Sequence, residues 1–132
     1  MSGMSRKSKG INAERELIAL FWETEKWAAH RIAGSGSSRF PSPDVLAGNG
    51  TRRLAIECKA SKKPVKYLTK EEIQQLKIFA ETFGAEPWIA VRFDKWFFLN
   101  LEDLKETKKS YVIPLDIAQR KGLIFEELVF DN

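Results

Sequence analysis

The feature that most constrains the fold is a Gly-Asn-Gly turn at residues 48–50, between two short apolar runs. The run before it is Val-Leu-Ala at 45–47, and the run after it is Leu-Ala-Ile at 54–56. Glycine and asparagine adopt the backbone conformations of a tight reversal, and short apolar runs beside such a turn are typical of strands. We therefore predict an antiparallel hairpin, which requires a β-sheet in the fold.

Side chains alternate between the two faces of a strand, so the second strand of this hairpin divides into two sets. One set is apolar and consists of Leu54, Ile56 and Cys58. The other set is Arg53, Ala55, Glu57 and Lys59. A connection of about four residues places Asp44 opposite Glu57, where directly opposed side chains lie about 5 Å apart. In that register Val45 and Ala47 join the apolar face.

Two neighbouring carboxylates repel each other at neutral pH, and a hairpin gains nothing from them. A divalent cation between Asp44 and Glu57 would replace this repulsion by attraction of both carboxylates to the cation. Lys59 points to the same side, within reach of a phosphate or its attacking water. Alternatively, Glu57 and Lys59 are the solvated face of an edge strand, and Asp44 is an acid near a turn. The combination of Pro43-Asp44, a short hairpin and Glu57-Cys58-Lys59 favours the first interpretation, because it resembles the active-site signature of the PD-(D/E)xK nuclease superfamily.

A length of 132 residues predicts one domain, residues 1–132, with a single core. No apolar run approaches the roughly 20 residues that span a bilayer, and no signal-peptide pattern is present, so we expect a cytoplasmic protein without membrane contact. Cys58 and His30 are the only cysteine and histidine, which excludes an internal disulfide and a zinc site. Any metal ion is therefore expected to bind mainly oxygen.

Positive charge is concentrated in the first 70 residues, which carry 14 Lys/Arg and 6 Asp/Glu, whereas residues 71–132 carry 8 and 12. This distribution suits a polyanion such as DNA, although charged surfaces also serve solubility alone. Because the basic residues accompany the acidic pair, we favour nucleic acid as the partner and expect a nucleoid-associated protein. The candidate DNA contacts from this region are Lys9, Arg39, Lys62 and Lys63.

The first predicted helix runs from Asn12 to about Trp27, with Asn12 or Ser8 as the N-cap. Its inward stripe is Leu17, Ile18 and Phe21. Glu14 falls at the buried edge of this stripe, so its carboxylate can be directed toward the hairpin as a third acid. The alternative explanation for Glu14 and for Glu16 is a favourable interaction with the helix dipole, and it accounts better for Glu16.

Residues 29–33 are predicted to form a strand, followed at 34–43 by a loop of mostly Gly, Ser and Pro. The loop leads directly into the hairpin. It either closes over a phosphate backbone, with Ser35 and Arg31 as contacts, or is an ordinary mobile connector, and spacing alone leaves both interpretations open.

Thr69 and Glu72 form a predicted capping box at the start of a second helix, which ends at Gly84 and covers one face of the sheet. The apolar stripe of this helix is Ile73, Leu76, Phe79, Ala80 and Phe83.

A further predicted hairpin pairs residues 87–93 with residues 96–101 through a two-residue connection. The second of these strands is apolar on both faces, so either helices of the same chain or a partner subunit must cover it. Beyond it, residues 111–113 are a candidate strand, and residues 114–130 contain short turns or a helix.

Four segments carry a resemblance to the archaeal Holliday-junction resolvases of the Hjc type. They are residues 9–17 (Lys-Gly-Ile-Asn-Ala-Glu-Arg-Glu-Leu), 31–35 (Arg-Ile-Ala-Gly-Ser), 43–50 (Pro-Asp-Val-Leu-Ala-Gly-Asn-Gly) and 56–59 (Ile-Glu-Cys-Lys). The resemblance implies an α/β, restriction-endonuclease-like fold with a central mixed β-sheet flanked by helices. It also implies a homodimer that uses Mg²⁺, with Mn²⁺ as a substitute, to cut branched double-stranded DNA at four-way junctions by paired nicks.

The resemblance also implies roles for individual residues of the acidic cluster. Asp44 and Glu57 would hold the metal ion, Glu14 would complete the cluster, and Lys59 would position or activate the water. Because Mg²⁺ binds hard oxygen ligands and keeps several waters, the backbone carbonyl of Cys58 is the expected further protein ligand.

Arg15 and Arg31 are the implied phosphate contacts, and Ser35 is the implied loop residue beside the scissile bond. The loop carries additional residues before the hairpin, so Ser37 and Ser38 are alternatives to Ser35. Two other functions share these features: a superfamily nuclease with another DNA target, and a non-catalytic DNA-binding module that retains the site. A comparison of junction cleavage with duplex cleavage distinguishes a resolvase from a nuclease with another target. Metal-dependent cleavage of DNA excludes a non-catalytic binding module.

Overall fold

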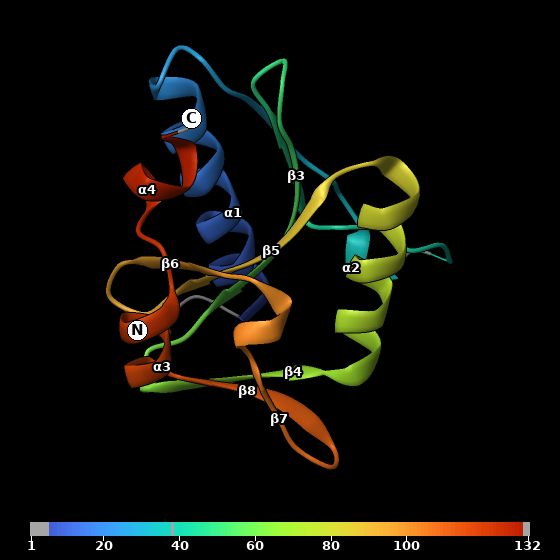
Figure 1. The fold of residues 1–132 in the computed structure, drawn as a ribbon, viewed down its shortest axis with the longest axis vertical. Helices are drawn as coiled ribbons and strands as arrows, with labels where there is room; N and C mark the ends of the chain where they lie inside the picture. Colours follow the sequence, from blue (N-terminus) through green and yellow to red (C-terminus); the bar gives the residue numbers. More distant parts are fainter. Residues whose placement is uncertain (1–5, 38, 131–132) are drawn as a thin grey trace.

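Helices flank two β-sheets in this protein (Figure 1). The structure is a computed structural model that describes residues 6–37 and 39–130. The elements in chain order are α1 (Arg6–Glu23), β1 (Ala28–Arg31), η1 (Ser35–Ser37), β2 (Val45–Gly48), β3 (Arg53–Ala60), β4 (Val65–Thr69), α2 (Lys70–Phe83), β5 (Glu86–Arg92), β6 (Trp96–Leu99), η2 (Leu101–Asp103), β7 (Lys105–Glu106), β8 (Ser110–Pro114), α3 (Leu115–Lys121) and α4 (Phe125–Val129).

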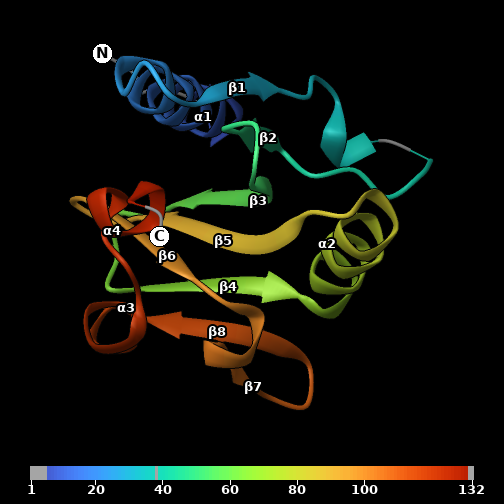
Figure 2. The ribbon, with the colours of Figure 1, turned by 45° about the horizontal axis from the view of Figure 1, so that its top comes forward.

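The larger sheet has five strands in the order β1-β2-β3-β5-β6. Its β3/β5 pair is parallel, and its other neighbouring pairs are antiparallel. The predicted central mixed sheet flanked by helices is therefore confirmed. A smaller antiparallel sheet with the order β4-β8-β7 lies on the side opposite α1 (Figure 2), and the sequence patterns did not predict it.

The β2–β3 hairpin has the predicted register. Val45 pairs with Ile56, and residues 49–52 connect the two strands. The amide oxygen of Asn49 accepts hydrogen bonds from two backbone N–H groups of the turn, at 2.9 and 2.6 Å. Gly50 has a φ of +94°, which a residue without a Cβ adopts at little cost. Local turn chemistry thus sets the register of the strands that carry the acidic pair.

Helix α1 begins and ends earlier than predicted. Ser8 and Asn12 lie inside the helix, so neither residue is its N-cap. The preceding Lys and Arg residues are good helix formers and allow the additional turns. At the other end, the hydroxyl of Thr24 donates to a carbonyl of the last turn at 2.6 Å, and Glu25 has a left-handed φ of +62°. The chain reverses there, and Trp27 turns into the core.

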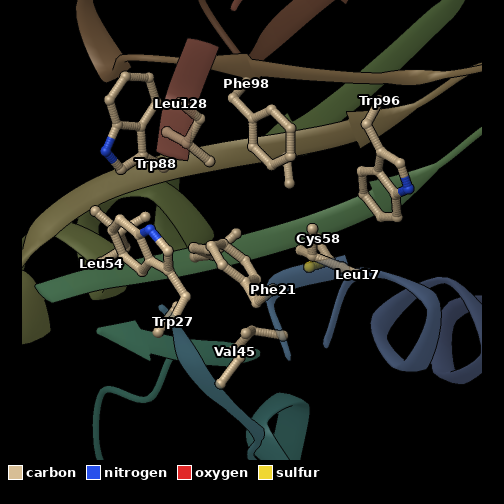
Figure 3. Packing of buried hydrophobic residues seen from close by; sticks show 14 of the residues in the cluster. Leu17, Phe21, Trp27, Val45, Leu54, Cys58, Trp88, Trp96, Phe98 and Leu128 are labelled. Atoms are coloured by element: carbon tan, nitrogen blue, oxygen red, sulfur yellow. The ribbon is translucent and has the colours of Figure 1, made fainter. Parts of the chain in front are cut away.

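Apolar clusters fill both faces of the central sheet. Helices α1 and α4 cover one face, and α2, α3 and the smaller sheet cover the other (Figure 2). The first cluster includes Leu17, Phe21, Val45, Leu54, Cys58, Phe98 and Leu128 (Figure 3). Ile56 belongs to the same cluster. The second includes Ala55, Leu68, Leu76, Ile89, Phe97 and Ile113. The predicted division of the β3 side chains between two faces is confirmed.

Strand β6 is buried along its whole length, and its two faces are covered within the chain. Phe98 packs against Phe125 of α4 with ring centroids 6.1 Å apart, and Phe97 belongs to the same cluster as Ala118 of α3. The outer edge of the strand is extended by hydrogen bonds between Phe98 and Leu123. Of the two predicted alternatives, cover by helices of the same chain is therefore correct.

Helix α2 keeps its predicted ends. Thr69 and Glu72 form the capping box, and Gly84 follows the last turn with a φ of +87°. The buried part of its stripe is Ile73, Leu76 and Ala80. Phe83 is 51% exposed instead of buried, and its ring stacks on Phe79 with centroids 5.1 Å apart.

The remaining differences lie in later segments. The β5–β6 turn contains residues 93–95 instead of the predicted two residues, because strand pairing ends at Arg92 and Trp96. Strand β8 contains the candidate strand at 111–113, and α3 and α4 account for most of the segment at 114–130. Within the described ranges, no helix combines the length and apolar character that a membrane span requires.

Candidate active site

The backbone of Asp44 is held on both sides where β2 begins. Its N–H donates to the carbonyl of Ile56 at 3.0 Å, and its carbonyl accepts the N–H of Ile32 at 2.8 Å. The hairpin register, continued by one residue beyond Val45, brings Asp44 beside Glu57. Asp44 is the one charged residue that is buried among those described, with 9% exposure. A carboxylate at this depth requires compensating partners.

The carboxylate of Asp44 has two neutral hydrogen-bond donors. Oδ2 accepts the backbone N–H of Cys58 at 2.8 Å, and Oδ1 accepts the hydroxyl of Ser35 at 2.6 Å. The hydroxyl of Ser37 instead bonds to a backbone carbonyl of its own loop at 3.3 Å, and Ser38 lies outside the described residues. The described loop serine at the site is therefore Ser35, which fastens the Gly/Ser loop to the acidic pair.

Glu57 faces Asp44 with most of its own carboxylate buried. Its side chain is 13% exposed, and Lys59 Nζ lies 3.8 Å from its Oε2. Burial, followed by the negative charge of Asp44, raises the pKa of Glu57 to about 9, although Lys59 opposes the shift. The protein at neutral pH thus favours a proton on Glu57, and a cation between the two carboxylates would favour the ionised form instead.

Glu14 lies beside this pair and is itself paired. Its Oε1 accepts a hydrogen bond from Arg31 Nε at 2.7 Å. Burial and then the charge of Asp44 raise the pKa of Glu14, while Arg31 lowers it, so the two acids are close enough to interact. In the described part of the chain, no three His, Cys, Asp or Glu side chains gather closely enough to hold a metal ion. The fold therefore brings the third acid near the site, but with Arg31 as its partner.

Lys59 has a second carboxylate partner, which the sequence patterns did not identify. Its Nζ donates to Oε2 of Glu72, the third residue of α2. The sequence indicated Glu72 only as a member of the capping box, because its contact with Lys59 depends on how α2 packs against β3. One signal in the sequence could have indicated this contact. The alternation of side chains along β3 directs Lys59 to the face of the sheet that α2 covers.

The other predicted DNA contacts lie on separate elements. They are Lys9 and Arg15 on α1, Arg39 on the loop before β2, and Lys62 and Lys63 directly after β3. Arg15, Arg39, Lys62 and Lys63 are exposed, and Lys9 is half-buried. The guanidinium of Arg39 lies 5.9 Å from the ring centroid of Phe40, which is also exposed. These five residues stay predictions as DNA contacts.

The assembled groups provide the chemistry that cleavage of a phosphodiester requires. Asp44 and Glu57 provide carboxylate oxygens, which are hard ligands of the kind that Mg²⁺ prefers. Lys59 provides an ammonium group on the same side, where it can stabilise negative charge on a phosphate. Basic residues on α1, on the loop and after β3 provide the positive charge that a DNA backbone requires.

Comparison with known proteins places nearly the whole length of the chain in one family. The sequence model of the archaeal Holliday junction resolvase family (Hjc) matches residues 5–131. Crossover junction endodeoxyribonuclease Hjc of Archaeoglobus fulgidus is 42% identical over 130 residues, which cover 92% of this chain and 95% of that protein. The protein of the same name from Methanocaldococcus jannaschii is 40% identical over 106 residues, which cover 80% of this chain and 75% of that protein.

The fold agrees with this grouping. The crystal structure of Archaeoglobus fulgidus Hjc, described as a Holliday junction resolvase from an archaeal hyperthermophile, superimposes with a TM-score of 0.83. The match has 40% sequence identity and covers 89% of this chain and 95% of the other. The predicted restriction-endonuclease-like architecture is consistent with this match. The chain therefore belongs to the archaeal Holliday junction resolvase (Hjc) family.

Proposed function

We propose that this protein is an endodeoxyribonuclease that resolves four-way DNA junctions by metal-dependent hydrolysis of phosphodiester bonds. The observation that carries the proposal is the pair of carboxylates on Asp44 and Glu57, whose mutual repulsion the chain only partly offsets. A purely structural or DNA-binding surface gains nothing from such a pair, whereas a divalent cation binds to it. Membership of the resolvase family supports branched double-stranded DNA as the substrate.

Mg²⁺ is the proposed cofactor, with Mn²⁺ as a substitute. The carboxylate oxygens of Asp44 accept the hydroxyl of Ser35 and the N–H of Cys58 and also face the carboxyl group of Glu57. The cationic partner of Glu57 among the described residues is Lys59. Two such carboxylates and the backbone carbonyl of Cys58 are a sufficient protein contribution for an ion that retains several waters. Glu14 would complete the set once Arg31 exchanges its carboxylate for a DNA phosphate.

The chain's own residues have distinct tasks in the proposed reaction. When bound, the cation lowers the pKa of a water molecule and offsets the charge that develops on the phosphate. Lys59 stabilises the same charge without losing its proton. Ser35 holds the orientation of Asp44 through its hydroxyl. Flanking phosphates are neutralised by Lys9, Arg15, Arg39, Lys62 and Lys63, so binding should weaken as salt increases.

A homodimer is part of the proposal, because paired nicks in opposed strands require two active sites and the described chain has one acidic pair. In a dimer with twofold symmetry, the distance between the two sites would select a branched substrate over a straight duplex. A cytoplasmic protein associated with the nucleoid is the setting that this activity implies.

The decisive experiment compares cleavage of a labelled four-way junction with cleavage of its matched duplex in Mg²⁺. Glu57→Gln preserves the shape of the side chain and removes its charge, and Glu71→Gln on the exposed side of α2 is the matched control. We expect symmetric nicks in the junction alone, and we expect Glu57→Gln to bind the junction without cutting it.

Each alternative has a distinct outcome in this experiment. Equal cleavage of junction and duplex would support a superfamily nuclease with another target. Absence of cleavage in both Mg²⁺ and Mn²⁺ would support a non-catalytic DNA-binding module. Loss of activity in Glu71→Gln as well as in Glu57→Gln would attribute the effect to charge in general and contradict the assigned site.

A further inference from the structure

Glu72 uses its two carboxylate oxygens for two different tasks. Oε1 accepts the backbone N–H of Thr69 at 2.8 Å, and the hydroxyl of Thr69 accepts the N–H of Glu72 at 2.9 Å. These reciprocal bonds cap α2 at its N-terminus. Oε2 is not needed for the cap, and it accepts a hydrogen bond from Lys59 Nζ.

Lys59 lies between two carboxylates but is bonded to one of them. Its Nζ is 3.8 Å from Oε2 of Glu57, beyond hydrogen-bond length, whereas its contact with Glu72 is a direct hydrogen bond. The side chains of Lys59 and Glu72 are 23% and 29% exposed, so both are partly withdrawn from solvent. The ammonium group is therefore held at a defined place beside the acidic pair, and Glu72 is the group that holds it.

The cap by itself does not require a negative charge at this position. Glutamine at the third residue of a helix closes a capping box as well as glutamate does. The charge matters for Lys59, because the ammonium group donates its hydrogen bond to Oε2 of Glu72, the carboxylate oxygen that the cap does not use. The charge of Glu72 thus has a partner in the active site and no necessary part in the cap.

The cap also makes Glu72 a rigid support. Its backbone is fixed in the first turn of α2, which packs on β3 and β5, and one carboxylate oxygen is fixed by Thr69. A lysine has a flexible four-carbon stem and loses much rotamer freedom when it is held in place. A support on a rigid element removes that loss from the reaction step.

We propose that Glu72 is a positioning residue that holds the ammonium group of Lys59 beside Glu57, ready to stabilise the phosphate during cleavage. The inference rests on the proposed nuclease function and adds to it a residue outside the acidic cluster and outside the Glu-x-Lys motif. Glu72 acts through Lys59 and is not itself in contact with the substrate.

Glu72→Gln tests this inference because it separates the two tasks. The amide oxygen of glutamine still accepts the Thr69 N–H, but the amide NH₂ cannot accept a hydrogen bond from Lys59. Thr69→Ala is the converse control, since it removes the hydroxyl of the cap and leaves Glu72 charged. Glu71→Gln controls for the loss of one negative charge in the same helical turn.

We expect the single-turnover rate of junction cleavage in Mg²⁺ to fall about tenfold or more in Glu72→Gln, with junction affinity changed by less than about twofold. Thr69→Ala should lower the thermal midpoint and retain the rate at a temperature where it is folded. Glu71→Gln should retain both the thermal midpoint and the cleavage rate of the wild-type protein. In a Lys59→Met background, Glu72→Gln should cause no further loss of rate, because the group that it positions is gone.

Several outcomes would overturn the inference. The inference fails if folded Glu72→Gln cuts the junction at the wild-type rate, or faster, since a faster rate would show that Glu72 sequesters Lys59. It also fails if Glu72→Gln lowers the rate by the same factor in the Lys59→Met background as in the wild-type protein. A rate loss in Glu72→Gln that Thr69→Ala reproduces in full would assign the effect to the cap. If the wild-type protein cuts no junction, the proposed function fails first, which distinguishes that failure from the failure of Glu72 alone.

Discussion

The acidic side chains near the two ends of strand β3 have opposite surroundings: one lies beside a cation and the other beside a second acid. Just before the strand, Arg52 donates to both carboxylate oxygens of Glu86 at 2.8 and 2.9 Å and to the carbonyl of Leu128 at 2.8 Å. The hydrogen bond from Arg52 lowers the pKa of Glu86 below its usual range. Toward the other end of the strand, burial and the charge of Asp44 raise the pKa of Glu57 to about 9.

The contrast is between an ion pair whose charges are matched within the chain and an acidic pair whose charges are not. At the Arg52 end, opposite charges meet within the chain, and the arrangement is complete. At the Asp44 end, like charges meet, and the nearest ammonium group, on Lys59, is bonded to another acid. Acids with strongly perturbed pKa values beside a like charge are characteristic of functional sites. The strand therefore joins a charge cluster that is matched within the chain to the acidic pair that we propose for catalysis.

The largest expected effect is the loss of cleavage in Asp44→Asn. Asparagine keeps the size of the side chain but removes the charge that a divalent cation requires, so we expect the rate of junction cleavage in Mg²⁺ to fall about 10³-fold or more. Single-turnover kinetics at saturating protein measures this loss. A mobility-shift assay without metal should give the same junction affinity for both proteins.

Glu86→Gln is the matched control at the opposite end of β3, because it also neutralises one carboxylate. We expect its cleavage rate to stay within about threefold of the wild-type rate at a temperature where it is folded. If Glu86→Gln and Asp44→Asn lose activity to the same extent, the two ends of the strand do not differ in function and the comparison is broken.

The next largest expected effect is a loss of stability, and it arises at the Arg52 end of β3. Arg52→Met removes the donor of three hydrogen bonds and leaves the carboxylate of Glu86 without that partner, so we expect the free energy of unfolding to fall by about 2–3 kcal/mol. Urea denaturation followed by tryptophan fluorescence measures this change. The cleavage rate per folded molecule should be unchanged, and a loss of activity beyond the loss of folded protein would contradict a purely structural role for Arg52.

The features that sequence patterns predicted correctly depend on neighbouring residues. The turn at Asn49 and Gly50 set the register of the hairpin, and this register placed Asp44 beside Glu57. The capping box and Gly84 set both ends of α2. In each case, hydrogen bonds and backbone conformations within a few residues decide the structure, so no knowledge of the distant chain is necessary.

The features that sequence patterns did not predict depend on residues far apart in the chain. Strand β4 exists through its pairing with β8, in which Leu68 lies opposite Tyr111. The contact between Lys59 and Glu72 exists because α2 packs on β3. The sequence around a single acid does not say which distant amine it meets, so the Glu-x-Lys motif was recognisable while the contact of its lysine with Glu72 was not.

The pH dependence of stability offers a smaller effect that sharpens the comparison. The pKa of Glu57 is about 9 in the folded protein and near its ordinary 4.5 in the unfolded chain. Between these values the folded state binds a proton that the unfolded chain lacks, so the free energy of unfolding decreases as pH rises. We expect metal-free protein to lose about 1–2 kcal/mol between about pH 6 and pH 8.

Glu57→Gln should remove most of this dependence, because glutamine is neutral in both states, and should be more stable than the wild-type protein at the higher pH. Urea denaturation at several pH values, with a chelator present, measures both quantities. A stability that rises with pH in the wild-type protein, or a slope that persists in Glu57→Gln, would contradict the assignment of the raised pKa to this residue.

The smallest expected effect is the stabilisation of the protein by Mg²⁺ in the absence of DNA. An ion that binds the folded state alone raises its stability according to the ratio of ion concentration to Kd, and about 1 kcal/mol corresponds to a concentration a few times Kd. For a chain of this length we expect a rise in thermal midpoint of about 3–5 °C near pH 8. Asp44→Asn should lose this rise, whereas Glu86→Gln should keep it, because the carboxylate of Glu86 is already occupied by Arg52. An equal rise in both variants would mean that Mg²⁺ acts on the general surface charge and that the two ends of β3 are alike toward cations.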